Sequence, residues 1–118
     1  MSKKRDIGIY LEDIVESIDY IERYARNVKR ETLEENSELQ DAIAYRLEVI
    51  GEAAKHIPKA VRDKYPSVPW QEAARTRDKI IHHYFELDLN EIWSIIQNDL
   101  LPLKKQIKSI LEDLDNRP

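Results

Sequence analysis

Cysteine is absent from this sequence of 118 residues, and glycine occurs only twice. Without cysteine the chain has neither disulfides nor thiolate metal ligands, which fits a reducing compartment. No run approaches the roughly 20 apolar residues of a membrane span. The basic start, Met1 to Asp6, is not followed by an apolar stretch, which argues against a signal peptide. We therefore expect a cytoplasmic protein.

What the chain does contain favours helices. It is rich in Glu, Lys, Leu, Ile and Ala, and 36% of its residues are charged. These residue types, together with so little glycine, predict an all-α protein. The length predicts a single domain over residues 1–118.

The charge is unevenly distributed. The net charge of −4 argues against general affinity for nucleic acid, but residues 55–83 carry seven basic side chains against three acidic ones. This region has a local charge of +4, which leaves −8 for the rest of the chain. A basic region in an acidic protein can bind phosphate locally, although it can also be only a solvated charged face.

Helical periodicity divides the chain into four main segments. Apolar residues recur at three- and four-residue steps over residues 6–26, 37–57, 69–84 and 88–114. Residues 27–37 predict a connection with one helical turn, and Pro58 to Tyr65 a short helical turn. Four main helices with short connections predict an up-and-down antiparallel four-helix bundle with a short extra helical turn.

Several single residues mark the ends and irregularities of these helices. Asn36 or Ser37 can cap the second helix, and the capping box Asp88-Leu89-Asn90-Glu91 opens the fourth. Pro102 should kink or split the fourth helix near Leu101. Gly51, inside the second helix, can permit a close approach of another helix.

The third segment concentrates the chemistry. On a continuous helix Asp78 and His82 are one turn apart on the same face, so the carboxylate can orient the imidazole. Arg77 projects to one side of that pair and can bind a phosphate through two N–H groups. An anion clamp beside a proton-transfer group suits metal-independent cleavage of RNA, in which the ribose 2′-hydroxyl attacks the phosphodiester.

Other interpretations of the same residues remain open. Asp78 and His82 can be a surface pair beside a solvated Arg77. Glu48 and Glu52 can neutralise Arg77 or Arg46 across helices. We expect no cofactor. We also expect no metal site, because His82 and His83 are adjacent and point apart on a helix, so that His56, His82 and His83 do not supply three well-spaced ligands.

The segment from Arg77 to Tyr84 resembles the Arg-x4-His-x-Tyr signature of the HepT proteins, which are HEPN-domain toxins of the HEPN/MNT toxin–antitoxin type. Asp78 fits the small polar residue that is typical after the arginine. Residues 39–42, residues 46–55 and Trp70 resemble further parts of the family pattern. The resemblance covers nearly the whole chain.

This resemblance implies a HEPN-like bundle that dimerises with the two Arg-x4-His segments facing each other. It implies a metal-independent endoribonuclease toxin of a type VII-like pair that acts on tRNA or mRNA. By position, Arg77 would contact the scissile phosphate and His82 would be the acid–base. The implied partner is a minimal nucleotidyltransferase (MNT) antitoxin that silences the toxin by transferring AMP to Tyr84. An adenylate there would obstruct RNA and add negative charge beside Arg77.

Arg75, Lys79 and His83 are further candidates for RNA binding. Two alternatives belong to other functional classes. The chain can be a non-catalytic helical module that binds a nucleotide or partner and accompanies a nucleotidyltransferase, or a purely structural dimerisation bundle. The first alternative predicts that Arg77 matters for binding while His82 is dispensable.

Overall fold

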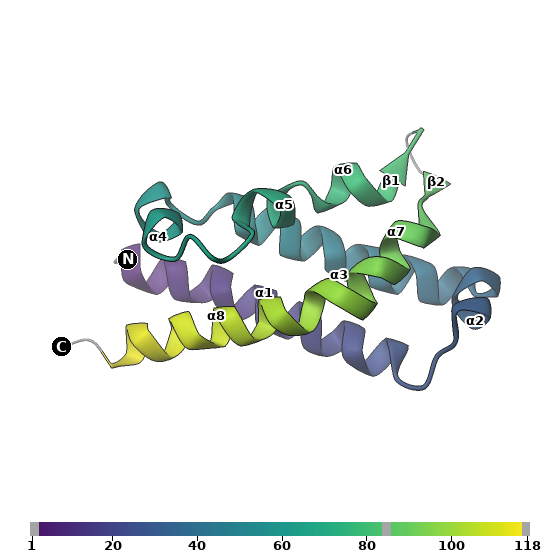
Figure 1. Cartoon of the computed structure of the whole chain (residues 1–118), viewed down its shortest axis with the longest axis horizontal. Coiled ribbons are helices and arrows are strands. Elements are labelled where there is room, and N and C mark those ends of the chain that lie inside the picture. The colour runs from purple at the N-terminus through teal and green to yellow at the C-terminus, as the bar shows by residue number, and fades with distance from the viewer. Residues whose placement is uncertain (1–2, 84–85, 117–118) are drawn as a thin grey trace.

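The chain runs back and forth along one long axis, as Figure 1 shows. This computed structural model describes residues 3–83 and 86–116, and side chains from residue 6 onward. Helix α1 (Lys3–Ala25) leads from one end to the other and α3 (Ser37–Lys55) returns; α5 (Trp70–Ala74) and α6 (Thr76–Ile80) lead away again, and α8 (Leu100–Asp115) returns. This course confirms the predicted all-α, up-and-down bundle.

The core lies where α1 packs against α3 and α8. Its fully buried side chains are branched aliphatic residues at helical spacing, among them Leu11, Ile14, Ile18, Ile21, Ile43, Leu47, Ile50, Ile107 and Ile110. Burial of each such side chain contributes about 1.5–3 kcal/mol. Within the described ranges, no helix is both long and apolar enough to cross a bilayer.

Short helices occupy the connections, as the sequence predicts. Helix α2 (Arg30–Glu35) buries Leu33, and α4 (Lys59–Lys64) follows Pro58. Asn36 caps α3, because its side-chain oxygen accepts a hydrogen bond from the backbone N–H of Leu39 at 3.0 Å.

The predicted continuous third helix is wrong. The chain forms two short helices, α5 and α6, separated at Arg75, whose φ of −99° and ψ of 14° lie outside the helical region. The Thr76 hydroxyl donates a 2.6 Å hydrogen bond to the Ala73 carbonyl, a local bond that competes with the helical pattern. The interruption changes which side chains face inward, so Thr76 and Ile80 are buried while Arg77 is exposed.

Gly51 permits this junction to lie close to α3. A Cβ atom at Gly51 would stand 3.3 Å from the Ala73 carbonyl oxygen and 3.7 Å from Thr76 Cβ. The predicted close approach at Gly51 is therefore confirmed, and its contact is the backbone of the α5–α6 junction.

A short hairpin follows α6. Strand β1 (Ile81–His82) pairs antiparallel with β2 (Glu86–Leu87), and the backbone N–H of Asp88 donates to the Ile80 carbonyl at 2.7 Å. Isoleucine residues favour extended backbone, and His83 has a φ of 48°. The helix therefore ends at Ile80, four residues earlier than predicted.

The last segment is one helical run with a wide turn. It comprises α7 (Leu89–Ser94), the π-helical turn η1 (Ile95–Asp99) and α8. Pro102 has no N–H to donate and its ring would collide with the carbonyl four residues back. The predicted disturbance by Pro102 is present, but it takes the form of η1 upstream rather than a break near Leu101, and the run bends there (Figure 1).

Candidate active site

Arg77 lies at the surface against α3. Its Nε donates to Glu48 Oε1 at 3.2 Å, and the two side chains are 63% and 35% exposed. This is one of the ion pairs that the sequence left open. That bond uses Nε, which leaves the two terminal guanidinium nitrogens as donors that can bind an anion bidentately.

The surroundings of Arg77 are a shallow pocket of about 280 Å³, which also includes Gly51, Glu52 and Lys55. Lys55 Nζ bonds Glu52 Oε1 at 3.1 Å, so each cation in the pocket has its own carboxylate. An anion that entered this pocket would therefore meet two cations that are each already paired with a carboxylate.

His82 lies on β1 and not on a helix. Its Nε2 lies 3.2 Å from Asp88 Oδ2, and the imidazole is 49% exposed. An open pocket of about 440 Å³ at this position also includes Glu34, Glu86 and Asn90. The ring is thus held at one nitrogen by a carboxylate and is accessible to a substrate elsewhere.

Asp88 performs two tasks with its two oxygens. Oδ1 accepts the backbone N–H of Glu91 at 3.0 Å and caps α7, while Oδ2 contacts His82. The Glu91 N–H, followed by the His82 contact, holds the pKa of the Asp88 carboxyl below its ordinary value, although partial burial acts in the opposite direction. Asp88 is therefore an ionised anchor that ties His82 to the start of α7.

The predicted pairing of Asp78 with His82 is wrong. That pairing needs one helical turn between the two residues, and the chain leaves the helix at Ile80. The carboxylate that meets His82 is Asp88, six residues downstream. In the sequence Asp88 is recognisable only as a helix cap. The β-branched and aromatic run Ile80-Ile81-His82-His83-Tyr84-Phe85 is the one sequence sign of extended structure before Asp88.

The remaining candidates lie around these two groups. Arg75 is exposed at the α5–α6 junction, and Lys79 forms an ion pair with Glu72 at 3.6 Å. His83 is exposed at the turn end of β1. Tyr84, the predicted AMP acceptor, lies outside the described residues.

The described part of the chain contains no group of three or more His, Asp or Glu side chains placed to hold a metal ion. Among these same residues no hydrogen bond or ion pair joins Arg77 to His82; Arg77 is held from α3 and His82 from the start of α7. The arrangement therefore offers one anion-binding group and one imidazole, each exposed and each fixed by a carboxylate.

Comparisons with known proteins agree with this chemistry. The model of the family described as ribonuclease HepT-like matches residues 14–110. The chain is 40% identical over 114 residues to a Methanocaldococcus jannaschii protein with a provisional RNase name, covering 97% of this chain and 94% of that protein. It is 39% identical over 107 residues to a Thermococcus cleftensis protein provisionally named ribonuclease HepT, covering 91% of this chain and 97% of that protein.

A further relative is longer than this chain. It is an M. jannaschii protein whose name combines gamma-glutamylcyclotransferase with a provisional RNase, and it is 41% identical over 112 residues. The match covers 95% of this chain and half of that protein. No solved structure matches the chain significantly.

Proposed function

The chain belongs to the HepT-like ribonuclease family, and from this premise we propose that it is a metal-independent endoribonuclease toxin. The single observation that supports the catalytic assignment is that Arg77 and His82 are both exposed and each is held by one carboxylate. These are the two side-chain types that phosphodiester cleavage needs, one to bind the phosphate and one to transfer protons.

The proposed reaction breaks the bond between phosphorus and the leaving 5′-oxygen. A base takes the proton of the ribose 2′-hydroxyl while that oxygen forms a new bond to phosphorus, and an acid gives a proton to the departing 5′-oxygen. Arg77 binds the non-bridging phosphate oxygens as negative charge accumulates on them. His82 is the proton-transfer group.

Two carboxylates are the proposed positioning residues. Glu48 holds Arg77 by Nε and leaves the terminal nitrogens for phosphate; Asp88 fixes the orientation of the His82 ring. Asp88 takes the supporting role that the sequence suggested for Asp78.

One chain supplies one His82, whereas the reaction uses a base and an acid. We therefore propose a homodimer in which the two Arg77–His82 segments face one cleft and each copy contributes one imidazole. The substrate is RNA, with tRNA or mRNA as the expected classes, and Arg75, Lys79 and His83 add positive or titratable groups near the cleft.

The test compares RNA cleavage by purified wild type, Arg77→Ala and His82→Ala. We expect losses of about 10²–10⁴-fold for His82→Ala and about 10²–10³-fold for Arg77→Ala. Arg62→Ala and His56→Ala are the controls, because both residues are exposed and neither is a hydrogen-bond partner of Arg77, His82, Glu48 or Asp88. Unchanged cleavage by both folded site variants would overturn the catalytic assignment. Loss of RNA binding in Arg77→Ala with an unimpaired His82→Ala would favour the non-catalytic binding module.

We also propose the regulation that the family resemblance suggests, in a type VII-like pair with a minimal nucleotidyltransferase antitoxin. That partner transfers AMP to the phenolic oxygen of Tyr84, with pyrophosphate leaving ATP. Incubation with the nucleotidyltransferase and ATP should add one adenylate to wild type and none to Tyr84→Phe, as read by intact mass and peptide mapping. An adenylate found on another residue in the wild type would refute the assignment.

A further inference from the structure

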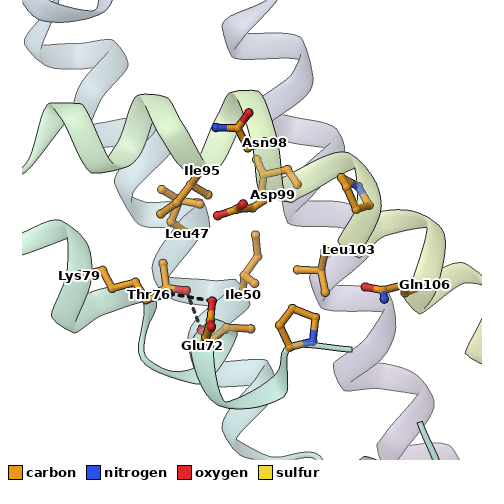
Figure 2. A pocket seen from close by; sticks show the side chains of 14 residues that line it. Leu47, Ile50, Glu72, Thr76, Lys79, Ile95, Asn98, Asp99, Leu103 and Gln106 are labelled. Carbon is orange, nitrogen blue, oxygen red and sulfur yellow. Dashed lines mark hydrogen bonds and ion pairs between the residues drawn. The ribbon is translucent and has the colours of Figure 1, made fainter. Parts of the chain in front are cut away.

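A third cavity lies between α3, the α5–α6 pair and the run from η1 to α8 (Figure 2). Its volume is about 260 Å³, and it shares no lining residue with the pocket around Arg77. Both spaces nevertheless border α6, because Thr76 and Lys79 line the cavity while Arg77 lines the other pocket. Lys79 and Arg77 are two residues apart, about 3 Å along the helix axis but about 200° around it, so the two spaces lie on different sides of α6.

The floor of the cavity is aliphatic. Leu47, Ile50, Ile95 and Leu103 come from three different elements, and each is at most 7% exposed. These side chains are held in the core, so the apolar floor is preformed. An apolar floor suits the face of an aromatic ring better than a phosphate or a sugar.

The rim is polar, and its two carboxylates, Glu72 and Asp99, differ in whether they are paired with a cation. Glu72 is already paired with Lys79 at 3.6 Å, and the two are joined in Figure 2. Asp99 is exposed at this rim, and within residues 6–83 and 86–116 its carboxylate forms no hydrogen bond or ion pair with another side chain. Figure 2 shows the Asp99 carboxylate turned toward the space that the lining residues surround, with Asn98 on the same turn.

The π-helical turn η1 places Asp99 at the rim of the cavity. Asn98 and Asp99 are consecutive residues of η1, the π-helical turn that precedes Pro102, and both line the cavity. The same irregularity that Pro102 imposes thus places an acceptor over an apolar floor.

Size and chemistry together select the ligand. An apolar cavity of about 150 Å³ holds a benzene molecule, and drug-sized sites begin near 300 Å³. A space of about 260 Å³ therefore fits one heteroaromatic ring system. An unpaired carboxylate at its rim accepts hydrogen bonds from an exocyclic amine, as carboxylates do from the amine of cytosine.

We infer that this cavity binds a nucleobase with an exocyclic amine, cytosine or adenine, presented by the RNA that Arg77 holds at the phosphate. The inference rests on the proposed ribonuclease function. The base lies on the aliphatic floor, its amine donates to Asp99, and Lys79 lies beside the backbone of the same nucleotide. Sequence-selective RNA recognition generally reads unstacked bases in this manner.

The test has one arm that needs no cleavage. Cytidine, adenosine, uridine and guanosine are titrated separately into isotope-labelled wild type, Asp99→Asn and the control Asp115→Asn, and backbone amide shifts are followed. Asp115 is exposed on the same run, so its change to Asn makes the same chemical alteration away from the cavity. We expect cytidine or adenosine to bind at least about fivefold tighter than uridine, with shifts around Thr76 and Leu103.

Asp99→Asn should lose that preference and Asp115→Asn should keep it. Equal binding of all four nucleosides, shifts confined to other regions, or an unchanged preference in Asp99→Asn would overturn the inference.

The second arm uses RNA that differs only in the base beside the cleaved bond. Wild type should cleave the cytosine or adenine substrates at least about fivefold faster than the uridine one, and Asp99→Asn should cleave them alike. Cleavage that depends on Arg77 and His82 without base preference would reject the cavity and keep the ribonuclease. If the protein binds nucleosides selectively but cleaves no RNA, the ribonuclease assignment is wrong. The base in the cavity would then not come from an RNA substrate.

Discussion

At the residue scale, Asp88 connects the stability of the fold to the candidate chemistry. One oxygen caps α7 and the other contacts His82, so the carboxylate that orients the imidazole is itself fixed by a helix terminus. A side chain bound at both oxygens has little freedom to rotate. The His82 ring is consequently held by a rigid element, even though His82 lies on a short exposed hairpin.

The first prediction concerns Asp88 and pH. Its pKa is lowered in the folded protein, chiefly by the Glu91 N–H, so its ionised form stabilises the fold above the ordinary carboxyl pKa. This contribution is lost as the pH falls through the folded-state pKa. Asp88→Asn keeps a capping oxygen but removes the charge, and should lower the free energy of unfolding at pH 7 by less than about 1 kcal/mol.

Urea unfolding of both proteins between pH 2.5 and pH 7 measures that difference. It should be largest near neutrality and should shrink below about pH 4. A difference that grows toward acid would mean that Asp88 is protonated in the native state.

The second prediction concerns the contact between Glu48 and Arg77. If Glu48 positions the guanidinium, Glu48→Ala should reduce RNA cleavage by about tenfold, mainly in kcat, while Glu48→Gln keeps an acceptor and retains more activity. The pair is exposed, so thermal stability should change little.

A double-mutant cycle separates positioning from competition. In an Arg77→Ala background, Glu48→Ala should have no further effect on cleavage, because the group it positions is gone. Faster cleavage by Glu48→Ala than by wild type would show instead that Glu48 competes with phosphate for Arg77.

At the element scale, the sequence predicts long helices well and local interruptions poorly. The amphipathic repeat of residues 6–26 and 37–57, the Asn36 cap and the capping box at Asp88 all correspond to observed features. The third segment carried the same repeat, yet it is two short helices and a strand. Apolar periodicity alone cannot show that a side-chain hydroxyl donates to a backbone carbonyl and interrupts a helix, as Thr76 does. It also cannot show that two short strands pair to form a hairpin.

The candidate site shows the same division. Arg77 and His82 follow from residue types and the family signature, whereas their partners depend on geometry across elements. Glu48 is one of several partners that the sequence allows for Arg77. The pairing of Asp88 with His82 depends on the antiparallel contact of β1 with β2, which helical periodicity does not predict. A close approach at Gly51 can be predicted from the sequence, but the segment that approaches it, the α5–α6 junction, cannot.

The third prediction uses the two glycines as a matched pair. Gly51→Ala places a Cβ 3.3 Å from a backbone carbonyl that Thr76 already binds, so α5 and α6 must move away from α3. We expect this strain to outweigh the helix propensity of alanine and to destabilise the fold by about 1 kcal/mol. Cleavage should fall too, because Arg77 moves relative to Glu48.

Gly8→Ala is the control, because a Cβ there meets nothing within 4 Å. It should stabilise the fold by up to about 1 kcal/mol through helix propensity alone. Thermal or urea unfolding measures both variants, and equal effects of the same sign would contradict the close approach at Gly51.

At the scale of the whole molecule, the fold divides structural work from exposed chemistry. The packing of α1 with α3 and α8 contains most of the fully buried side chains, while the third segment lies along α3 and leaves Arg77 and His82 at the surface. A second copy can therefore face this segment without disturbing the core. Exposed Tyr45, on α3 near the Glu48 side of the site, is 58% accessible and is available to such a contact.

The fourth prediction tests whether one cleft uses His82 from both copies. Wild type and His82→Ala are co-refolded at equal concentration, so that subunits mix at random. If base and acid come from different copies, only dimers with two intact imidazoles cleave, and activity should be about a quarter of that of the same total wild type. Independent subunits would give about half. Mixing with His56→Ala, which leaves His82 intact, should give full activity, and mixing without refolding should give half because exchange is prevented. A value of half after verified exchange would assign both proton transfers to a single chain, with another group beside His82 as the second partner.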